Sequence, residues 1–201
     1  MTRYLIGIDE AGRGPLAGPV AIGVVMVPRN FDWRSVKGVK DSKKLSPRAR
    51  ETWCKKIKEL KRDGALNFAV SCASAVVIDR RGIAPAIRTA IARCLARLDV
   101  HPRYSEIRLD GSLKAPEHFV NQKTIIGGDD LEQIIAMASV VAKVRRDRYM
   151  ERMASRFPAY GFEVHKGYGT LVHRTAIKRE GLCELHRVTF CRKLLWGSNP
   201  V

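Results

Sequence analysis

Short apolar runs that end in acidic residues are the feature of this sequence that most restricts its fold. The run YLIGI is followed by Asp9 and Glu10, EIRL by Asp110, and TIIGG by Asp129. Runs of this length, rich in Ile, Leu and Val, are typical of buried strands. Three such strands in one sheet can bring the four carboxylates to a common edge. Hard divalent cations prefer oxygen ligands, so the pattern favours a metal site there.

The rest of the chain is strongly basic. Lys and Arg number 37 against 20 Asp and Glu, which gives a formal net charge of +17. Such an excess attracts polyanions, above all nucleic acid. Charge alone also fits a solvated surface or a non-catalytic nucleic-acid-binding protein. The acidic residues point to catalysis as well as binding, because two divalent ions about 3.5–4 Å apart can clamp the attacking and leaving oxygens of a phosphodiester.

The apolar periodicity predicts a mixed α/β fold. In chain order it predicts strands at 3–9, 19–27 and 66–77, a helix at 79–99, strands at 106–109 and 123–126, and helices at 131–155, 171–180 and 182–196. The first three strands are close in sequence, which favours an antiparallel meander. The last two are separated by helices and should run parallel to the first strand. We therefore expect a mixed five-stranded sheet flanked by helices, with a small C-terminal helical extension.

The length of 201 residues, 45% of them hydrophobic, is enough for one compact domain. We expect a catalytic core at 1–155 and a C-terminal loop with helices at 156–201 that completes the substrate-binding site. No apolar stretch is long enough to span a membrane. Five cysteines without a CxxC pair, and no secretory leader, predict free thiols and a cytoplasmic protein. We also expect a monomer. A zinc site at Cys183, His186 and Cys191 is disfavoured because a structural site needs four ligands.

Six motifs, in order along the chain, resemble those of ribonuclease HII, the type 2 ribonuclease H. They are IDEAGRGPLAGPV, DSKKLS from Asp41, LDGS at Asp110, GDDLEQIIAMASVVAKVRRD from Gly128, HKGYGT from His165 and HRVTF from His186. The resemblance implies the ribonuclease H-like fold. It also implies cleavage of the RNA strand of RNA–DNA hybrids, and cleavage 5′ of ribonucleotides embedded in duplex DNA, with 3′-hydroxyl and 5′-phosphate products. Type 3 relatives carry an extra N-terminal domain, and this chain begins almost at the first strand, so type 2 is preferred.

The resemblance also implies catalytic residues and a cofactor. The metal ligands would be Asp9, Glu10, Asp110 and Asp129, holding Mg²⁺ or Mn²⁺, with two ions present during catalysis. Asp129 is preferred to Asp130 because Ser139 and Lys143 follow it at the spacing of the family. The plainer alternative is that carboxylates at strand ends are solvated or cap helices.

Substrate recognition is implied for three further groups of residues. Main-chain groups of Gly12, Arg13 and Gly14 would contact the 2′-hydroxyl at the RNA–DNA junction, and Tyr168 would pack on the junction sugar. The phosphate contacts would come from Lys43, Lys44, Lys143 and Lys166. Each group has a plainer interpretation: glycines of a tight hairpin, a half-buried tyrosine and solvated lysines. The glycines do not predict a nucleotide-phosphate loop, because a second β-branched run follows them rather than a helix.

Several positions limit the resemblance or leave alternatives open. Gly127 stands where the family carries a lysine, which removes one phosphate contact. Arg146, Asp147 and Arg187 are expected to form structural ion pairs. The family can dock on a sliding clamp through an aromatic C-terminal tail, but LLWGSNPV offers only Trp196 and no convincing motif. Another nuclease of the same fold, such as an integrase or junction resolvase, would share the acids but lack the GRG segment and the KGY tyrosine.

Overall fold

The sheet has five strands in the order β3-β2-β1-β4-β5. The structure, a computed structural model, describes residues 3–196, with the backbone alone at Trp196. The strands are β1 (Tyr4–Ala11), β2 (Val20–Pro28), β3 (Asn67–Ala73), β4 (Ser105–Asp110) and β5 (Gln122–Ile125). Strands β1, β2 and β3 are antiparallel neighbours, while β4 runs parallel to β1 and β5 parallel to β4. The predicted mixed sheet is confirmed, and the pairing of Ile8 with Leu109 brings the acidic ends of β1 and β4 together.

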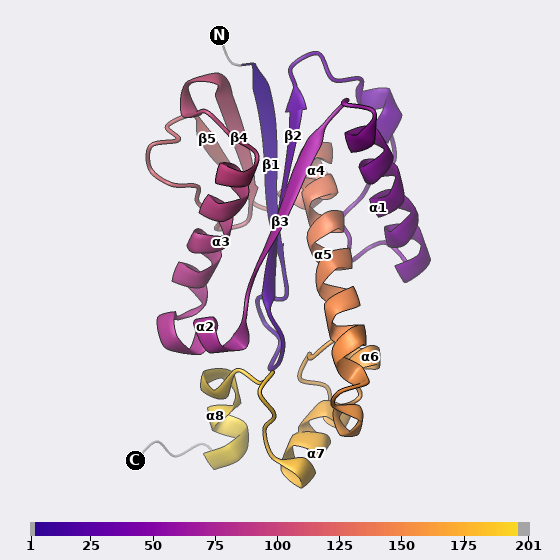
Figure 1. Cartoon of the computed structure of the whole chain (residues 1–201), viewed down its shortest axis with the longest axis vertical. Helices are drawn as coiled ribbons and strands as arrows, with labels where there is room; N and C mark the ends of the chain where they lie inside the picture. The colour runs from indigo at the N-terminus through magenta and orange to yellow at the C-terminus, as the bar shows by residue number, and fades with distance from the viewer. Residues whose placement is uncertain (1–2, 197–201) are drawn as a thin grey trace.

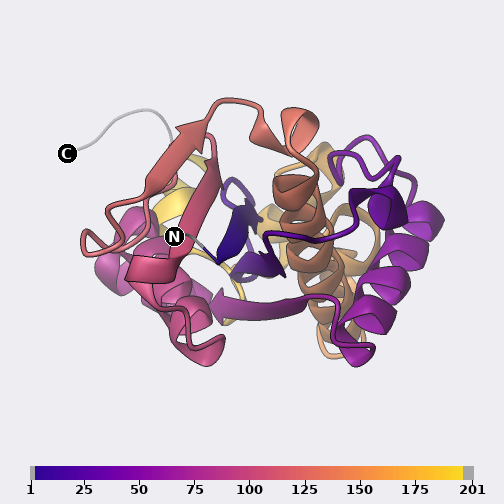
Figure 2. The same cartoon turned by 90° about the horizontal axis from the view of Figure 1, so that it is seen from above.

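Helices cover both faces of the sheet, as predicted (Figure 1). One face packs against α3, and the other against α5, which lies between the sheet and α1 (Figure 2). The α-helices are α1 (Pro47–Arg62), α2 (Ala75–Arg81), α3 (Ile83–Arg97), α4 (Gly128–Leu131), α5 (Gln133–Ala154), α6 (Phe162–His165), α7 (Leu171–Glu180) and α8 (Val188–Trp196). Three short 3₁₀ helices lie at Trp33–Val36, Pro102–Tyr104 and Pro158–Tyr160.

Two strand glycines let α5 lie directly on the sheet. A Cβ atom at Gly7 would come within 2.3 Å of the carbonyl oxygen of Ile134, and one at Gly23 within 2.2 Å of that of Ala138. Side chains larger than hydrogen would push the helix away from β1 and β2. The 22-residue helix α5 is therefore buried along much of its length. Even so, no helix between residues 3 and 196 is long and apolar enough to cross a membrane.

The C-terminal helices gather around the turn that follows β1, at the end of the sheet away from the N-terminus (Figure 1). Ala17 and His186 form an isolated antiparallel bridge there. An apolar cluster joins this turn to the end of α5 and to α6, α7 and α8 through Ala17, Met150, Phe162, Ile177 and Cys191. Residues before and after position 155 thus share one small core. The division at 155 stays a prediction.

Three predicted elements differ clearly in their bounds from those observed, and one observed helix was not predicted. The strand at 66–77 ends at Ala73, because Ser74 caps α2 through its side chain. The helix at 79–99 is two helices, broken at Gly82, whose φ is +81°. The helix at 182–196 begins only at Val188. Helix α1 has no counterpart among the predicted elements, although Ser46 caps it and Pro47 stands in its first turn.

Candidate active site

Three of the four predicted acids lie in one cleft at the ends of β1 and β4. The cleft has a volume of about 250 Å³, and Asp9, Glu10 and Asp110 line it. It also brings together many of the residues predicted to bind substrate: Gly12, Arg13, Gly14, Lys43, Lys143 and Tyr168. These residues come from β1 and the turn after it, the loop before α1, β4, α5 and the loop before α7. Segments far apart in sequence therefore form one concave polar surface.

Asp9 is a buried carboxylate that is only partly satisfied. Its side chain is on the α5 face of β1, and the residue is 2% exposed. Oδ1 accepts a hydrogen bond of 2.7 Å from the Glu10 amide, whereas Oδ2 has no hydrogen-bond partner among residues 3–196. Burial, with further contributions from the charges of Glu10 and Asp110, raises the pKa of Asp9 to about 8, and Ser139 offsets only part of the shift. Near neutral pH this group needs a proton or a cation beside it.

Glu10 and Asp110 add negative charge to the same cleft. Burial and the charge of Asp110 raise the pKa of Glu10, while Arg13, at 3.5 Å, opposes the shift. Oδ1 of Asp110 accepts a hydrogen bond of 2.8 Å from the amide of Gly128, which ties β4 to the start of α4. The three carboxylates repel one another, and a bound cation would relieve that repulsion.

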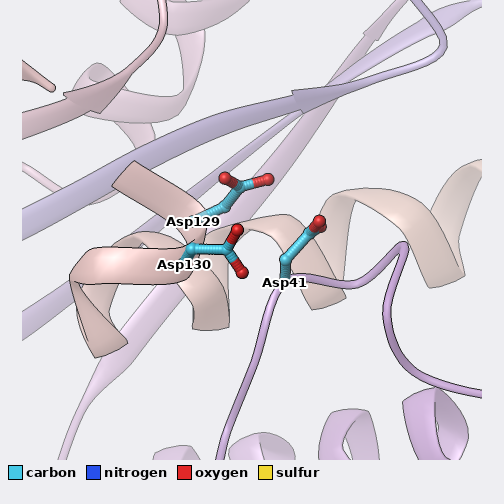
Figure 3. A group of neighbouring side chains, drawn as sticks. All are labelled: Asp41, Asp129 and Asp130. Atoms are coloured by element: carbon cyan, nitrogen blue, oxygen red, sulfur yellow. The ribbon is translucent and has the colours of Figure 1, made fainter. Parts of the chain in front are cut away.

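Asp129 lies beside this cleft in a second acidic group (Figure 3). Asp129 and Asp130 are on α4, and Asp41 is on the loop opposite; their oxygen atoms come within 4.8 Å of one another. Within residues 3–196, no equally close group unites the four predicted acids. Asp129 is 5% exposed and faces inward, whereas Asp130 is exposed and pairs with Lys44 at 2.7 Å. Neither caps α4, because the N-cap is Gly127 with a φ of +65°.

The ammonium group of Lys43 connects the two acidic groups. Its Nζ is 3.2 Å from Oδ2 of Asp129. Partial burial lowers the pKa of Lys43, but the charges of Asp129 and Asp41 outweigh burial and raise it, with a further contribution from Asp9. Asp41 was not among the predicted site residues, although its place in the DSKKLS motif is a signal that could have indicated it. The Lys43 ammonium already neutralises Asp129, and carboxylate oxygens such as those around it are the ligands that hard divalent ions prefer.

Two buried arginines hold the GRG segment from the inside. Arg187 donates to the carbonyl oxygens of Gly12 (2.6 Å), Arg13 (2.8 Å) and Gly18 (3.0 Å). Arg146 donates to two carbonyls of the same loop, and a Cβ at Gly12 (φ +86°) would come within 1.9 Å of its Nε. Burial and the charge of Arg146 lower the pKa of Arg187 to about 10.

The predicted ion pairs are wrong for both arginines. Neither Arg146 nor Arg187 has a carboxylate within 4.0 Å among the described residues, and both bind backbone carbonyls instead. The prediction is confirmed for Asp147, which pairs with Lys143 at 2.8 Å and with Arg50 at 3.9 Å. The two arginines are functional candidates that sequence reasoning missed. Arg187 is in the HRVTF motif, but nothing in the local sequence indicates contacts with residues about 170 positions away.

Tyr168 projects from the loop between α6 and α7 and is 43% exposed. The Lys143 Nζ and the Arg146 guanidinium carbon are 5.7 and 5.6 Å from its ring centroid. The carbonyl of Gly167 accepts hydrogen bonds from the amides of Leu16 (2.9 Å) and Ala17 (3.3 Å). This contact joins the tyrosine loop to the loop that carries the GRG segment, so the two predicted recognition elements form one unit.

The predicted phosphate-binding lysines are paired with carboxylates. Lys43 and Lys44 contact Asp129 and Asp130, and Lys143 contacts Asp147. Lys166 is 2.8 Å from Glu151 and does not line the cleft. It lines a larger groove of about 600 Å³ that shares Lys143 and Tyr168 with the cleft. Their phosphate contacts stay predictions.

Comparison with known proteins identifies the family. The profile of ribonuclease HII matches residues 6–197. The ribonuclease HII of Caldicellulosiruptor bescii is 40% identical over 193 residues, covering 96% of this chain and 89% of that protein. The chain belongs to the ribonuclease HII family. The RNase HII of Archaeoglobus fulgidus, solved in a complex with PCNA, matches with a TM-score of 0.75 and 25% identity over 98% of this chain and 97% of that one.

The family membership confirms the ribonuclease H-like fold and the enzyme class. Ribonucleases HII are endonucleases that hydrolyse the RNA strand of RNA–DNA hybrids, and this chain is such a hydrolase. Bst-RNase HIII, solved in complex with Mn²⁺, shares the fold with a TM-score of 0.68 and 18% identity over 96% of this chain and 70% of that one. In this chain the acidic cleft and the orphaned Oδ2 of Asp9 are the features that suit a divalent metal.

Proposed function

We propose that the cleft cuts RNA in duplex with DNA and also cuts 5′ of a ribonucleotide embedded in duplex DNA, leaving 3′-hydroxyl and 5′-phosphate ends. The observation that carries the proposal is the unsatisfied buried carboxylate of Asp9. It lies beside Glu10 and Asp110 and is in the same cleft as the GRG segment and Tyr168. A catalytic group and a sugar-reading surface thus share one cavity.

The metal ligands in this proposal are Asp9, Glu10, Asp110 and Asp129, and the ions are Mg²⁺ or Mn²⁺. When bound, two such ions activate water and stabilise the leaving oxygen of a phosphodiester. The chain supplies negative charge, holds Asp110 through the Gly128 amide and keeps Asp9 out of water. Lys43 neutralises Asp129 in the structure and would exchange this contact for a phosphate when the metal arrives.

Recognition of the ribose follows from the way the GRG segment is held. Arg187 donates hydrogen bonds to the carbonyls of Gly12 and Arg13 from the buried side of the segment. Within the described chain, the amides of Arg13 and Gly14 donate no hydrogen bond to protein atoms, so they can serve a 2′-hydroxyl. Tyr168 stands at the same cleft and supplies a ring face for the sugar. The 2′-hydroxyl is the group that distinguishes RNA from DNA.

The deciding experiment compares cleavage of three duplexes: a long RNA–DNA hybrid, DNA with one embedded ribonucleotide, and all-DNA duplex. We expect cleavage of the first two and none of the third. Asp110→Asn should abolish turnover but keep hybrid binding, because it removes a charge without adding bulk. Cleavage of all-DNA duplex would favour another nuclease of the same fold, and binding without any cleavage would favour a non-catalytic nucleic-acid-binding protein.

A second variant tests the sugar-reading role. Tyr168→Ala should weaken discrimination for the ribonucleotide more than overall binding, since loss of a stacking platform costs about 1–3 kcal/mol in single-stranded systems. Uniform loss of all activities together with a large drop in melting temperature would show that Tyr168 has only a packing role.

A monomeric state, a cytoplasmic location and a sliding-clamp partner stay predictions. The side chain of Trp196 and residues 197–201, on which clamp docking would depend, lie outside the described residues.

A further inference from the structure

A second hollow, of about 290 Å³, adjoins the catalytic cleft and is lined by cations. Arg13, Arg88 and Lys114 border it together with the hydroxyl of Ser112, and Ile87 and Leu113 form part of its lining. Among residues 3–196, no acidic side chain lines this hollow. Arg13 lines both the hollow and the catalytic cleft, so the two are neighbours.

The charges in this hollow differ from those in the larger groove. In the groove, Lys143, Lys166 and Arg148 each have a carboxylate partner, whereas Arg48 has none within 4.0 Å among the described residues. In the hollow, neither Arg88 nor Lys114 has a carboxylate within 4.0 Å anywhere in the part of the chain that the structure describes. Arg13 contacts Ser112 at 3.1 Å and Glu10 at 3.5 Å. Cationic side chains that have no carboxylate partner and surround a hollow are suited to bind an anion. A guanidinium group can donate two parallel hydrogen bonds to two oxygens of one phosphate.

We propose that this hollow, which we call the Arg88 hollow, binds a backbone phosphate of the substrate beside the phosphodiester that is cut. The proposal rests on the proposed function, because it requires the duplex to lie in the adjoining cleft. Arg88 and Lys114 would hold the phosphate, and the Ser112 hydroxyl would donate to it. This contact would fix the strand next to Arg13 and so set its register over the acids.

The test is the salt dependence of binding, measured without divalent metal so that nothing is cut. For the double variant Arg88→Ala/Lys114→Ala, the slope of log affinity against log salt should become shallower by about 0.9, because the chain then neutralises one phosphate fewer. The matched control is Lys55→Ala/Lys58→Ala, which removes two exposed charges from α1, on the other side of the sheet. Its slope should equal that of the unmodified chain.

An unchanged slope in Arg88→Ala/Lys114→Ala, or an equal change in both double variants, would overturn the proposal. Melting curves confirm that each variant is folded at the assay temperature. The proposed function is judged separately by cleavage of the ribonucleotide-containing duplex by the unmodified chain with metal present. If the unmodified chain does not cleave this duplex, the slope measurement, which needs no turnover, still tests phosphate binding in the Arg88 hollow.

A different observation carries a second inference: three buried histidines lie behind the loop of Tyr168. His173 Nδ1 is 2.9 Å from the carbonyl oxygen of Tyr168, and its Nε2 is 3.1 Å from Nε2 of His186. The His173 ring also stacks on His165, with centroids 4.4 Å apart. A carbonyl can only accept, so His173 must donate from Nδ1 and, when neutral, accept at Nε2.

The tautomers of the other two rings follow from their hydrogen-bond partners in the same way. His186 must carry its proton on Nε2, and its Nδ1 then accepts the amide of Cys183 at 2.9 Å. His165 donates from Nε2 to the Tyr160 carbonyl at 2.7 Å and accepts the Gly167 amide at Nδ1. The geometry assigns His173 as a positioning residue, which sets the backbone of Tyr168 and through it the ring in the cleft. The inference rests on the proposed role of Tyr168.

Two amide substitutions at His173 distinguish a positioning role from a packing role. In His173→Asn the amide nitrogen falls near the place of Nδ1 and can donate to the Tyr168 carbonyl, whereas in His173→Gln it falls near Nε2. Both lose the stacked ring, so both should melt lower. Only His173→Asn should keep the preference for a ribonucleotide duplex over all-DNA duplex in binding, and His173→Gln should lose most of it. Equal preference in the two variants, measured where both are folded, would overturn the assignment.

Discussion

At the residue scale, Asp9 carries a conflict between stability and function. Its pKa is about 8 in the folded chain against 3.8 when unfolded. A raised carboxyl pKa contributes stability below the unfolded value, and this contribution is lost as pH rises from about 3.8 through 8. Above that range the buried charge destabilises the fold when no metal is present. A divalent ion would remove the conflict.

Asp9→Asn should therefore abolish cleavage and yet raise the melting temperature at pH 9 in a chelator. One kcal/mol corresponds to about 2–4 °C for a chain of this size, so we expect a gain of several degrees. The gain should shrink at pH 5, and also when Mg²⁺ is added to both proteins. Asp130→Asn, at an exposed paired carboxylate, is the control and should show no gain. Identical pH profiles for Asp9→Asn and the unmodified chain would contradict the buried-charge account.

The hydrogen bonds of Arg187 lead to a second prediction at the residue scale. Arg187→Met removes three hydrogen bonds to the GRG loop and leaves buried carbonyls unsatisfied. Each orphaned group costs about 1–3 kcal/mol, so the variant should melt well below the unmodified chain and cut ribonucleotide duplex poorly. Arg29→Met, which removes an exposed pair with Glu106, should change neither property much. Normal activity in Arg187→Met would show that the GRG loop holds its shape alone.

Part of this site could be predicted from the sequence. Asp9 and Asp110 follow apolar strands, so their place at a sheet edge follows from local pattern and parallel pairing. The hydrogen bonds that hold the GRG segment and the Tyr168 loop could not be predicted in the same way. The bonds of Arg187 span about 170 residues, and the link between His173 and His186 depends on how α7 and α8 pack around the turn after β1. Such contacts have no periodic signal.

At the element scale, the approach of α5 to the sheet sets the depth of the catalytic cleft. Gly23→Ala places a methyl group where only 2.2 Å separates it from the Ala138 carbonyl oxygen. Overpacking of this kind costs about 1–3 kcal/mol. The shift of α5 also moves Ser139 and Lys143, so turnover should fall together with stability in melting and cleavage assays. Gly38→Ala, at a loop glycine with open space around it but a φ of +93°, should reduce stability while leaving the turnover of the folded enzyme unchanged.

The elements that were predicted correctly are those with strong apolar periodicity. Strands β1 and β2 are almost continuously buried, and their limits were predicted within about two residues. Helix α1 is largely polar and buries only Cys54 and Ile57, so its signal was the cap at Ser46 rather than hydrophobicity. The run after Ala73 favours a strand because Val76 and Val77 are β-branched, yet the Ser74 cap begins a helix there.

At the scale of the whole molecule, the net charge of +17 should govern affinity for nucleic acid. Binding that releases counterions weakens linearly in log affinity against log salt, with a slope of about −0.9 per phosphate contact. We expect a steep slope for hybrid, for ribonucleotide duplex and for all-DNA duplex alike, because phosphate contacts carry no sugar information. Fluorescence anisotropy in chelator across a salt series measures it. A flat dependence would show that the basic surface does not serve nucleic-acid binding.

The buried histidines should lower the stability of the fold in mild acid, and in this they oppose Asp9, whose raised pKa favours the folded chain over the same range. Burial lowers the pKa of His173 and His186 from 6.5 to about 4. A depressed histidine pKa means that protons bind preferentially to the unfolded chain, so the contribution of these histidines to stability is complete above about pH 6.5 and declines as pH falls toward 4. His173→Asn removes one of these groups, and its melting temperature should fall less steeply between pH 6.5 and 4 than that of the unmodified chain. His101→Gln, at an exposed histidine, is the control and should keep the original slope. Parallel pH profiles for His173→Asn and the unmodified chain would mean that the cluster accepts protons while folded, which would contradict the neutral tautomers assigned to these rings.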